Sequence, residues 1–188
     1  MKLNKNDICE DLSIFRFINT YCFENIAYLL KRKEDYIFDY NVKLSNGVNL
    51  QRDLIWTNQQ KAELIISLIK GISLGQIQVL ISSKTTSTMG DKVYKIIDGK
   101  QRMNAIFDFV DNKFPIKEKF YFNDCDKSIQ DIINNYYFRA VASYEYPDSK
   151  YTDKDLINWF HNVNFSGTPQ DINHINKLKE SIQQSNKL

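Results

Sequence analysis

The sequence of 188 residues lacks long hydrophobic runs. Its apolar stretches are only a few residues long, whereas a helix that crosses a bilayer needs roughly 20 apolar residues. The first residues, MKLNKNDICEDL, also lack the apolar core of a secretory signal. We therefore expect a cytoplasmic protein without a membrane partner.

Cysteine and histidine are scarce as well. The three cysteines, Cys9, Cys22 and Cys125, are odd in number and show no CxxC spacing, which argues against a disulfide framework and against a zinc knuckle. The two histidines, His161 and His174, offer little material for a histidine metal site or for a Ser-His-Asp relay. We expect both to be ordinary structural or surface residues.

A strong excess of one charge is absent too. The 25 basic and 23 acidic side chains leave a formal net charge of +2, so no strong overall field attracts nucleic acid or an anionic membrane. Any contact with DNA would need a local cationic patch. What is present is a globular composition, 43% hydrophobic and 26% charged, in a length that suits one domain with a buried core.

The first third of the chain predicts helices followed by a hairpin. Apolar residues at helical spacing over residues 11 to 32 indicate one or two helices, closed by a cationic end. Residues 36 to 44 alternate loosely and run into Ser45-Asn46-Gly47, a turn signal before residues 48 to 50. We expect these two extended segments to pair.

The middle third predicts a capped helix and a second hairpin. Thr57 and Asn58 suit the start of a helix over residues 58 to 70, with Gly71 as its stop. Residues 77 to 81 and about 92 to 97 read as strands, joined by a polar Ser/Thr loop at 82 to 90. A helix with an apolar face at Met103, Ile106, Phe107 and Val110 follows.

The last third predicts a helix near residues 127 to 135, a strand near 138 to 146, and helices near 152 to 163 and 170 to 185. The order mixes helices and hairpins without a repeated strand-helix-strand unit. An α+β fold therefore suits the sequence better than a doubly wound sheet.

Asp98-Gly99-Lys100-Gln101-Arg102 lies between a predicted strand and a predicted helix. A strand, a glycine turn and a helix start direct free N–H groups and the positive end of the helix dipole to one point, which suits an anion such as phosphate. Lys100 adds a compact ammonium charge, and Arg102 adds a planar guanidinium whose N–H groups can bind phosphate oxygens in pairs. Alternatively, Asp98 and Gln101 form a capping box and nothing more.

A second polar group, Gln51-Arg52-Asp53, precedes Leu54-Ile55-Trp56 and follows an extended segment. Taken alone, Arg52 reads as a solvated surface cation, and Trp56 reads as a core residue. Two Gln-Arg pairs that each follow an extended segment would converge on a polyanion if the two segments were neighbours. The sequence leaves both alternatives open.

The two motifs together resemble the N-terminal domain of GmrSD-type, modification-dependent restriction endonucleases, a ParB/sulfiredoxin-like family. The signatures of that family are "QR…W" and, 40 to 50 residues later, "DGQQR" after a strand. Phe160, Asn164 and the run Gly167-Thr168-Pro169 match a third element of the family, an aromatic, an asparagine and a Gly-Thr-Pro run. The resemblance covers about residues 36 to 175.

The resemblance implies an α+β fold, a ParB/sulfiredoxin-like mixed small sheet with surrounding helices and a helical C-terminal part. The chain would then divide into an N-terminal helical segment at residues 1 to 35 and the ParB/sulfiredoxin-like domain with its helical extension at 36 to 188. It also implies an enzyme that binds and hydrolyses a nucleoside triphosphate, or a DNA nuclease, acting in restriction, phage defence or counter-defence.

Carried over position by position, the resemblance assigns the site. Asp98, Gln101 and Arg102 would be catalytic, and Asp98 would hold Mg²⁺ or another divalent metal, or orient water. Arg52 and Arg102 would neutralise phosphate charge, as preorganised cations do for transferring phosphoryl groups. The remaining residues expected to bind the nucleotide and its phosphates are Gln51, Gly99, Lys100 and Asn164.

Two departures from the family pattern concern catalysis. Lys100 replaces the first glutamine of "DGQQR", which makes the site more positive, and Asp53 replaces a proline that often follows the first Gln-Arg pair. Multidomain relatives continue into an HNH-type nuclease domain, for which 188 residues and two histidines give no room. A separate nuclease subunit, or this small domain itself, would have to cut DNA. The alternative is a DNA- or nucleotide-binding module without catalysis, or a small ParB-like nuclease.

Overall fold

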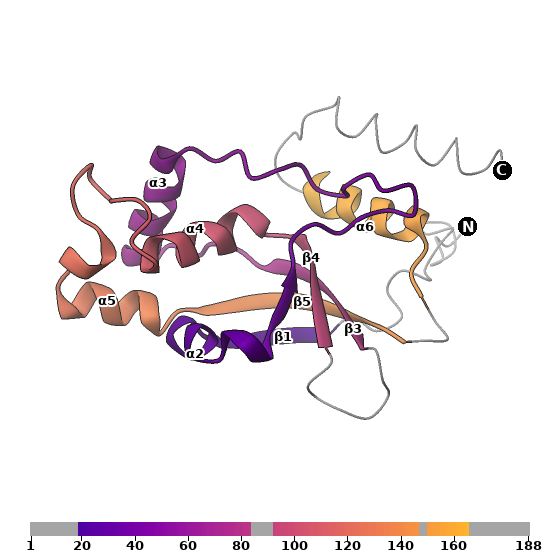
Figure 1. The fold of residues 1–188 in the computed structure, drawn as a ribbon, viewed down its shortest axis with the longest axis horizontal. Coiled ribbons are helices and arrows are strands. Elements are labelled where there is room, and N and C mark those ends of the chain that lie inside the picture. Colours follow the sequence, from indigo (N-terminus) through magenta and orange to yellow (C-terminus); the bar gives the residue numbers. More distant parts are fainter. Residues whose placement is uncertain (1–18, 84–91, 147–149, 166–188) are drawn as a thin grey trace, which may run out of the picture.

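The computed structural model describes residues 19–83, 92–146 and 150–165. Within these ranges helices and strands alternate irregularly along the chain (Figure 1). No helix there is long and apolar enough to cross a bilayer. In chain order the elements are β1 (Asn19–Asn25), α2 (Ile26–Lys31), η2 (Lys33–Asp35), β2 (Ile37–Asp39), α3 (Asn58–Ile69), β3 (Ile77–Ser83), β4 (Lys92–Asp98), α4 (Lys100–Val110), η4 (Phe122–Asp124), α5 (Lys127–Asn134), β5 (Tyr137–Glu145) and α6 (Asp153–Phe165).

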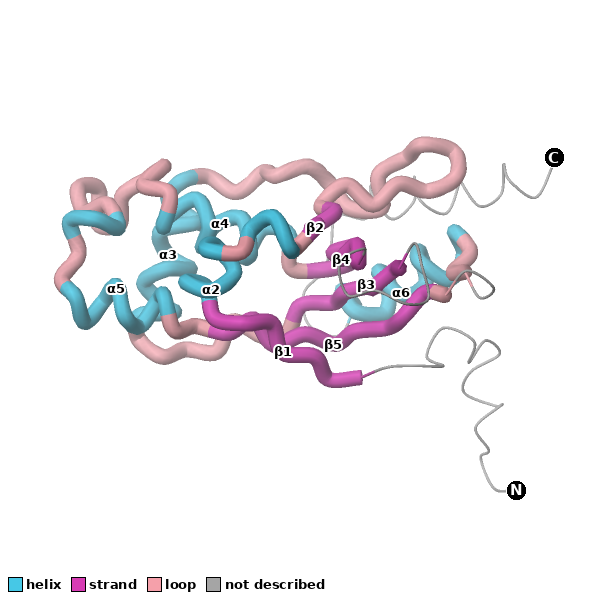
Figure 2. Tube along the Cα trace, turned by 60° about the horizontal axis from the view of Figure 1, so that its bottom comes forward, coloured by secondary structure: helices cyan, strands magenta, loops and turns pink. Residues whose placement is uncertain are grey.

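The strands form one mixed sheet in the order β1-β5-β3-β4-β2. β1 pairs antiparallel with β5 and β3 pairs antiparallel with β4, whereas β3–β5 and β2–β4 are parallel. Figure 2 shows this order across the sheet, with α2 to α5 gathered at one side and α6 at the other. The α+β class predicted from the sequence is confirmed.

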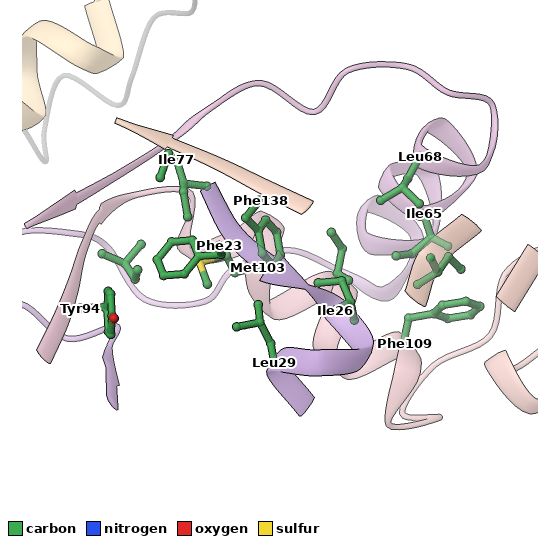
Figure 3. Close-up of a cluster of buried hydrophobic side chains, with 14 of the residues drawn as sticks. Phe23, Ile26, Leu29, Ile65, Leu68, Ile77, Tyr94, Met103, Phe109 and Phe138 are labelled. Atoms are coloured by element: carbon green, nitrogen blue, oxygen red, sulfur yellow. The ribbon is translucent and has the colours of Figure 1, made fainter. Parts of the chain in front are cut away.

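Two hydrophobic cores lie on opposite faces of the sheet. Because side chains alternate along a strand, Val79 and Ile81 of β3 join the core with α2 to α5, while Leu80 between them joins the core with α6. β4 repeats the pattern, with Ile96 in the first core and Ile97 in the second. Figure 3 shows part of the first core.

The N-terminal helix prediction is wrong for residues 19 to 25, which form β1. In this strand Phe23 is buried and Tyr21 half-buried, whereas Cys22 and Glu24 are exposed, so the apolar period is two. Pairing with β5, more than 110 residues away in sequence, decides that this segment is a strand. The apolar residues of the longer stretch from 11 to 32 also fit helical spacing, and this fit hid the period of two. The helix predicted up to residue 32 is confirmed for α2, and residues 11 to 18 lie outside the described ranges.

The first predicted hairpin is partly right. A turn does occur at residues 45 to 47, where Gly47 has a φ of 82°, and it is flanked by one antiparallel bridge between Lys43 and Asn49. The predicted pairing of residues 36 to 44 with residues 48 to 50 is wrong for β2, because β2 pairs in parallel with β4. Val42 and Leu44 are instead buried beside α6, and this burial takes the segment out of the sheet.

The remaining helices and strands predicted inside the described ranges are confirmed. Thr57 caps α3 in a capping box with Gln60, and Gly71 follows the helix with a φ of 74°. β3 and β4 form the second hairpin, and α4, α5, β5 and α6 occur where the sequence places them. The helix predicted near residues 170 to 185 lies outside the described residues.

Candidate functional site

The end of β4 and the first turn of α4 form one wall of a pocket of about 140 Å³. The segment after residue 50, which crosses from α6 to α3 (Figure 1), forms another wall. The lining consists of the segment from Asp98 to Arg102 together with Gln51, Arg52, Trp56 and Phe160. The two Gln-Arg pairs thus converge on one cavity, which we call the Arg52–Arg102 pocket.

Gly99 turns the chain from β4 into α4. Its φ of 103° lies in the left-handed region that favours glycine. A Cβ at this position would lie 2.3 Å from Cγ2 of Ile77, so packing against β3 also requires the missing side chain. The first turn of α4 faces the pocket, and the N–H groups of a first helical turn have no partners within the helix.

The alternative interpretation of Asp98 and Gln101, a capping box, is wrong. Gly99 occupies the N-cap position of α4, so the Asp98 carboxylate lies one residue too early to cap. Its Oδ2 instead accepts a hydrogen bond from Nη2 of Arg102 at 2.7 Å. This ion pair joins the strand end to the first turn of the helix inside the pocket.

Arg102 is held from two sides. Besides its ion pair with Asp98, its Nη1 donates to the carbonyl oxygen of Leu74 at 2.6 Å. Gly75 leaves room for the guanidinium, because a Cβ there would lie 3.1 Å from Nη1. Arg102 thus presents a preoriented cation, with part of its hydrogen-bonding capacity used within the protein.

Gln101 anchors the segment that crosses the pocket. Its Nε2 donates to the carbonyl oxygen of Asp53 at 2.9 Å, and its Oε1 accepts from the backbone N–H of Trp56 at 3.4 Å. Gln51 plays a similar part at the other end, because its buried side chain donates to the carbonyl oxygen of Ile96 in β4. Both glutamines therefore tie residues 51 to 56 to the β4–α4 junction.

Lys100 and Arg52 contribute the uncompensated positive charge. Lys100 is only 5% exposed, and its Nζ donates to the neutral Oδ1 of Asn41 at 3.1 Å. Arg52 is exposed. Neither cation forms an ion pair within the described part of the chain. A buried ammonium without a counter-charge is costly, and an anion in the pocket would supply that charge.

Across the pocket lining, three cations face one carboxylate, and that carboxylate is already paired with Arg102. The cavity is smaller than the roughly 300–1,000 Å³ of typical small-molecule sites, so it suits a phosphate group better than an entire nucleotide. Arg forks and Lys point charges are the side chains that bind phosphate in proteins. The chemistry of this lining at a helix N-terminus therefore suits an anion.

A divalent metal would find one carboxylate in this pocket. Asp98 uses Oδ2 for Arg102, and no hydrogen bond to its Oδ1 occurs among the described residues. Mg²⁺ commonly binds through one or two carboxylates together with substrate phosphates, so Asp98 fits such a metal. Asp53 does not line the pocket. No group of three His, Cys, Asp or Glu side chains suited to a metal occurs within the described ranges.

The third sequence element is only partly visible. Phe160 of α6 is buried and lines the pocket, as does the half-buried Trp56. Asn164 belongs to the last turn of α6, but its side chain lies outside what the structure describes, as do residues 167 to 169. Sequence reasoning missed Asn41 and Leu74, whose contacts hold Lys100 and Arg102, because no local pattern marks either residue.

The fold and the pocket together define the class of protein: a mixed α+β domain with a cationic pocket at a strand–helix junction. Residues 48–187 match the family described as GmrSD restriction endonuclease, N-terminal domain, and the chain belongs to this family. The resemblance seen in the motifs is thereby confirmed. No curated protein and no solved structure matches the chain.

Proposed function

We propose that the protein binds a nucleoside triphosphate by its phosphates in the Arg52–Arg102 pocket, in a role associated with DNA restriction. The observation that carries this proposal is the uncompensated positive charge of two cations that line the pocket, Lys100 at the start of α4 and Arg52 on the segment that crosses the pocket. The family, whose description names restriction endonucleases, supports the biological setting. The ParB/sulfiredoxin-like assignment of the fold stays a prediction.

The proposed activity is hydrolysis of the triphosphate. Water attacks the terminal phosphorus and the bond from that phosphorus to the β–γ bridging oxygen breaks, so that a nucleoside diphosphate, inorganic phosphate and a proton are released. Arg52, Lys100 and Arg102 neutralise charge on the phosphate oxygens. Asp98 would hold a divalent metal that arrives with the phosphates, and the metal would supply further charge neutralisation there. Gln101 and Gln51 keep residues 51 to 56 in place, so that Arg52 faces the same anion as Lys100.

The test compares Arg52→Ala with the unchanged protein. Arg52 is exposed and forms no ion pair among the described residues, so the substitution should leave the free energy of unfolding unchanged. Triphosphate binding should weaken at least about tenfold, which corresponds to a loss of about 1.4 kcal/mol in binding free energy. Arg139→Ala is the matched control, since Arg139 is also exposed but does not line the pocket. Isothermal titration with ATP, GTP and inorganic triphosphate, each with magnesium, gives the affinities.

Lys100→Gln is the second variant, because it restores the glutamine usual in the family. It removes a buried charge and can still donate to Asn41, so the free energy of unfolding should stay equal or rise, while triphosphate affinity falls. Equal triphosphate affinity in Arg52→Ala, Lys100→Gln and the unchanged protein would refute the phosphate site.

A second candidate is a binding module that does not turn the nucleotide over. The contacts of Gln101 and Arg102 favour it, because their polar groups are used to hold the protein's own backbone. Measurement of phosphate release separates the two candidates. Release that requires magnesium and disappears in Asp98→Asn supports hydrolysis, whereas tight binding without release supports the module.

A further inference from the structure

A second cavity, of about 420 Å³, lies along α4 where this helix faces α2 and β2. Its volume falls within the roughly 300–1,000 Å³ of sites for small organic molecules. Tyr36, Phe38, Tyr40 and Phe107 provide rings to its wall, and Asn104 provides an amide. We call this cavity the aromatic pocket. It shares no lining residue with the Arg52–Arg102 pocket.

The rings form one connected group around Phe38. Its centroid lies 5.9 Å from the ring of Tyr36, 6.0 Å from Tyr40 and 6.3 Å from Phe107. All four side chains are only half-buried, so ring surface remains uncovered toward the cavity. Stacking on such rings is the usual way in which proteins hold a nucleobase, and every base can use it.

Asn104 supplies a polar group without a partner. Its Oδ1 is buried and accepts no hydrogen bond among the described residues. A buried acceptor left unpaired costs free energy, so a ligand with an N–H donor would relieve a cost that the folded protein carries. Adenine, guanine and cytosine present such donors as exocyclic amino groups, whereas thymine has no amino group and offers only its ring N3–H.

Helix α4 joins this pocket to the anion site. Lys100 lines the Arg52–Arg102 pocket, and Asn104 stands one turn further along the same helix face, which is about 6 Å in rise. A second link is the chain at residues 40 and 41, where Tyr40 lines the aromatic pocket and Asn41 accepts the hydrogen bond from Lys100. The two cavities are therefore neighbours across a single helical turn.

We propose that the aromatic pocket binds a nucleobase, which stacks on the rings around Phe38 and donates an exocyclic N–H to Oδ1 of Asn104. The base belongs to the nucleotide whose phosphates occupy the Arg52–Arg102 pocket, and in this respect the inference rests on the proposed function. The pocket adds the base-dependent part of the affinity, which the phosphates alone do not supply.

Asn104→Leu tests the donor–acceptor contact. It replaces the amide with an apolar group of similar size and removes the orphan acceptor, so we expect unchanged or higher stability. Binding of adenosine, guanosine or cytidine should weaken at least about fivefold, and their advantage over thymidine should disappear. Asn49→Leu is the matched control, because Oδ1 of Asn49 is also buried without a partner but lies outside the aromatic pocket.

Phe107→Leu tests the stacking contact, with Phe120→Leu as its control, since Phe120 is 39% exposed and does not line the cavity. Loss of one stacking ring should weaken nucleoside binding about fivefold or more. Nucleosides that do not bind, or that bind equally to Asn104→Leu and the unchanged protein, would overturn the base pocket.

Inorganic triphosphate separates this inference from the phosphate site. If triphosphate binds and a nucleoside triphosphate binds no tighter, the base pocket is wrong and the phosphate site stands. If nucleosides bind and triphosphate does not, the phosphate site is wrong. The proposal that one nucleotide occupies both pockets is then wrong as well. A short single-stranded oligonucleotide that binds through Asn104 when mononucleotides fail would likewise overturn the inference, because the base would then belong to DNA and not to the nucleotide in the Arg52–Arg102 pocket.

Discussion

At the scale of single residues, the site depends on side chains that serve the protein's own structure as much as any ligand. Arg102 contributes a positive charge to the Arg52–Arg102 pocket, but its guanidinium also donates to the carbonyl oxygen of Leu74 and pairs with Asp98. Gln101 carries no charge and holds the backbone at Asp53 and Trp56. Substituting either residue therefore changes shape and chemistry together, whereas Arg52 offers a cleaner test of charge.

Gly99→Ala should destabilise the fold. The added Cβ would lie 2.3 Å from Cγ2 of Ile77, and this overpacking costs roughly 1–3 kcal/mol. The backbone φ of 103° at this position adds left-handed strain of roughly 1–2 kcal/mol for a residue with a side chain. Urea unfolding should thus show a loss of about 2–5 kcal/mol. Gly47→Ala isolates the strain, because Gly47 has a φ of 82° and open space around it. Equal losses in the two variants would contradict the clash with Ile77.

At the scale of elements, a buried carboxylate joins α3 to α4. Asp108 of α4 accepts from Nζ of Lys61 in α3 at 2.7 Å and from Nζ of Lys113 at 2.8 Å, and it is 8% exposed. Burial raises the pKa of this carboxyl, but the hydrogen bonds from the two lysines outweigh burial and leave the pKa below its ordinary value. The ionised form is thus favoured by folding.

Asp108→Asn should lower stability at pH 7 by about 1–3 kcal/mol, because the half-buried Lys61 loses its counter-charge. Since the folded pKa lies below the unfolded value of about 3.9, the contribution is complete above that pH and is lost as the pH falls through the folded pKa. Denaturant unfolding between pH 7 and pH 2.5 should show the two proteins converging in acid. Asp111→Asn, at a more exposed carboxylate, is the control, and a difference independent of pH would contradict the ion pair.

At the scale of the whole molecule, the sheet couples two hydrophobic cores, because successive residues of β3 and β4 belong to different cores. Leu80 belongs to the core with α6, while its neighbours Val79 and Ile81 in β3 belong to the core with α2 to α5. The Arg52–Arg102 pocket lies where the segment from residue 51 to residue 56 and Phe160 of α6 meet the end of β4. Its geometry therefore depends on both cores.

Leu80→Ala should destabilise the protein as a unit. Removing a fully buried leucine costs about 2–5 kcal/mol, and the shared strand should carry the effect to both faces. In a Trp56→Phe background, fluorescence of Trp159 reports on the α6 side, and circular dichroism reports on all helices. We expect coincident transitions, with Ile132→Ala at an exposed site as a mild control. Loss of the fluorescence signal before the helical signal would contradict coupling.

The sequence by itself determined the local structure of this protein. Capping residues and glycines set the ends of α3, and apolar periods set α4, α5 and β5, because these signals act within a few residues. The two Gln-Arg motifs also identified the family without a structure. β1 was predicted as a helix, because its strand conformation depends on β5, a distant partner that no local pattern reveals.

Only the tertiary structure decided how the motifs work together. It placed Arg52 in the lining of the same pocket as Lys100 and Arg102. It paired Asp98 with Arg102, so that Asp98 does not cap α4, and it directed the Gln101 side chain to the backbone of residues 53 and 56. These contacts join residues more than 40 positions apart or depend on one left-handed glycine. Such pairings arise from the packing of the entire sheet, so the same motif residues could be recognised in the sequence while their partners could not.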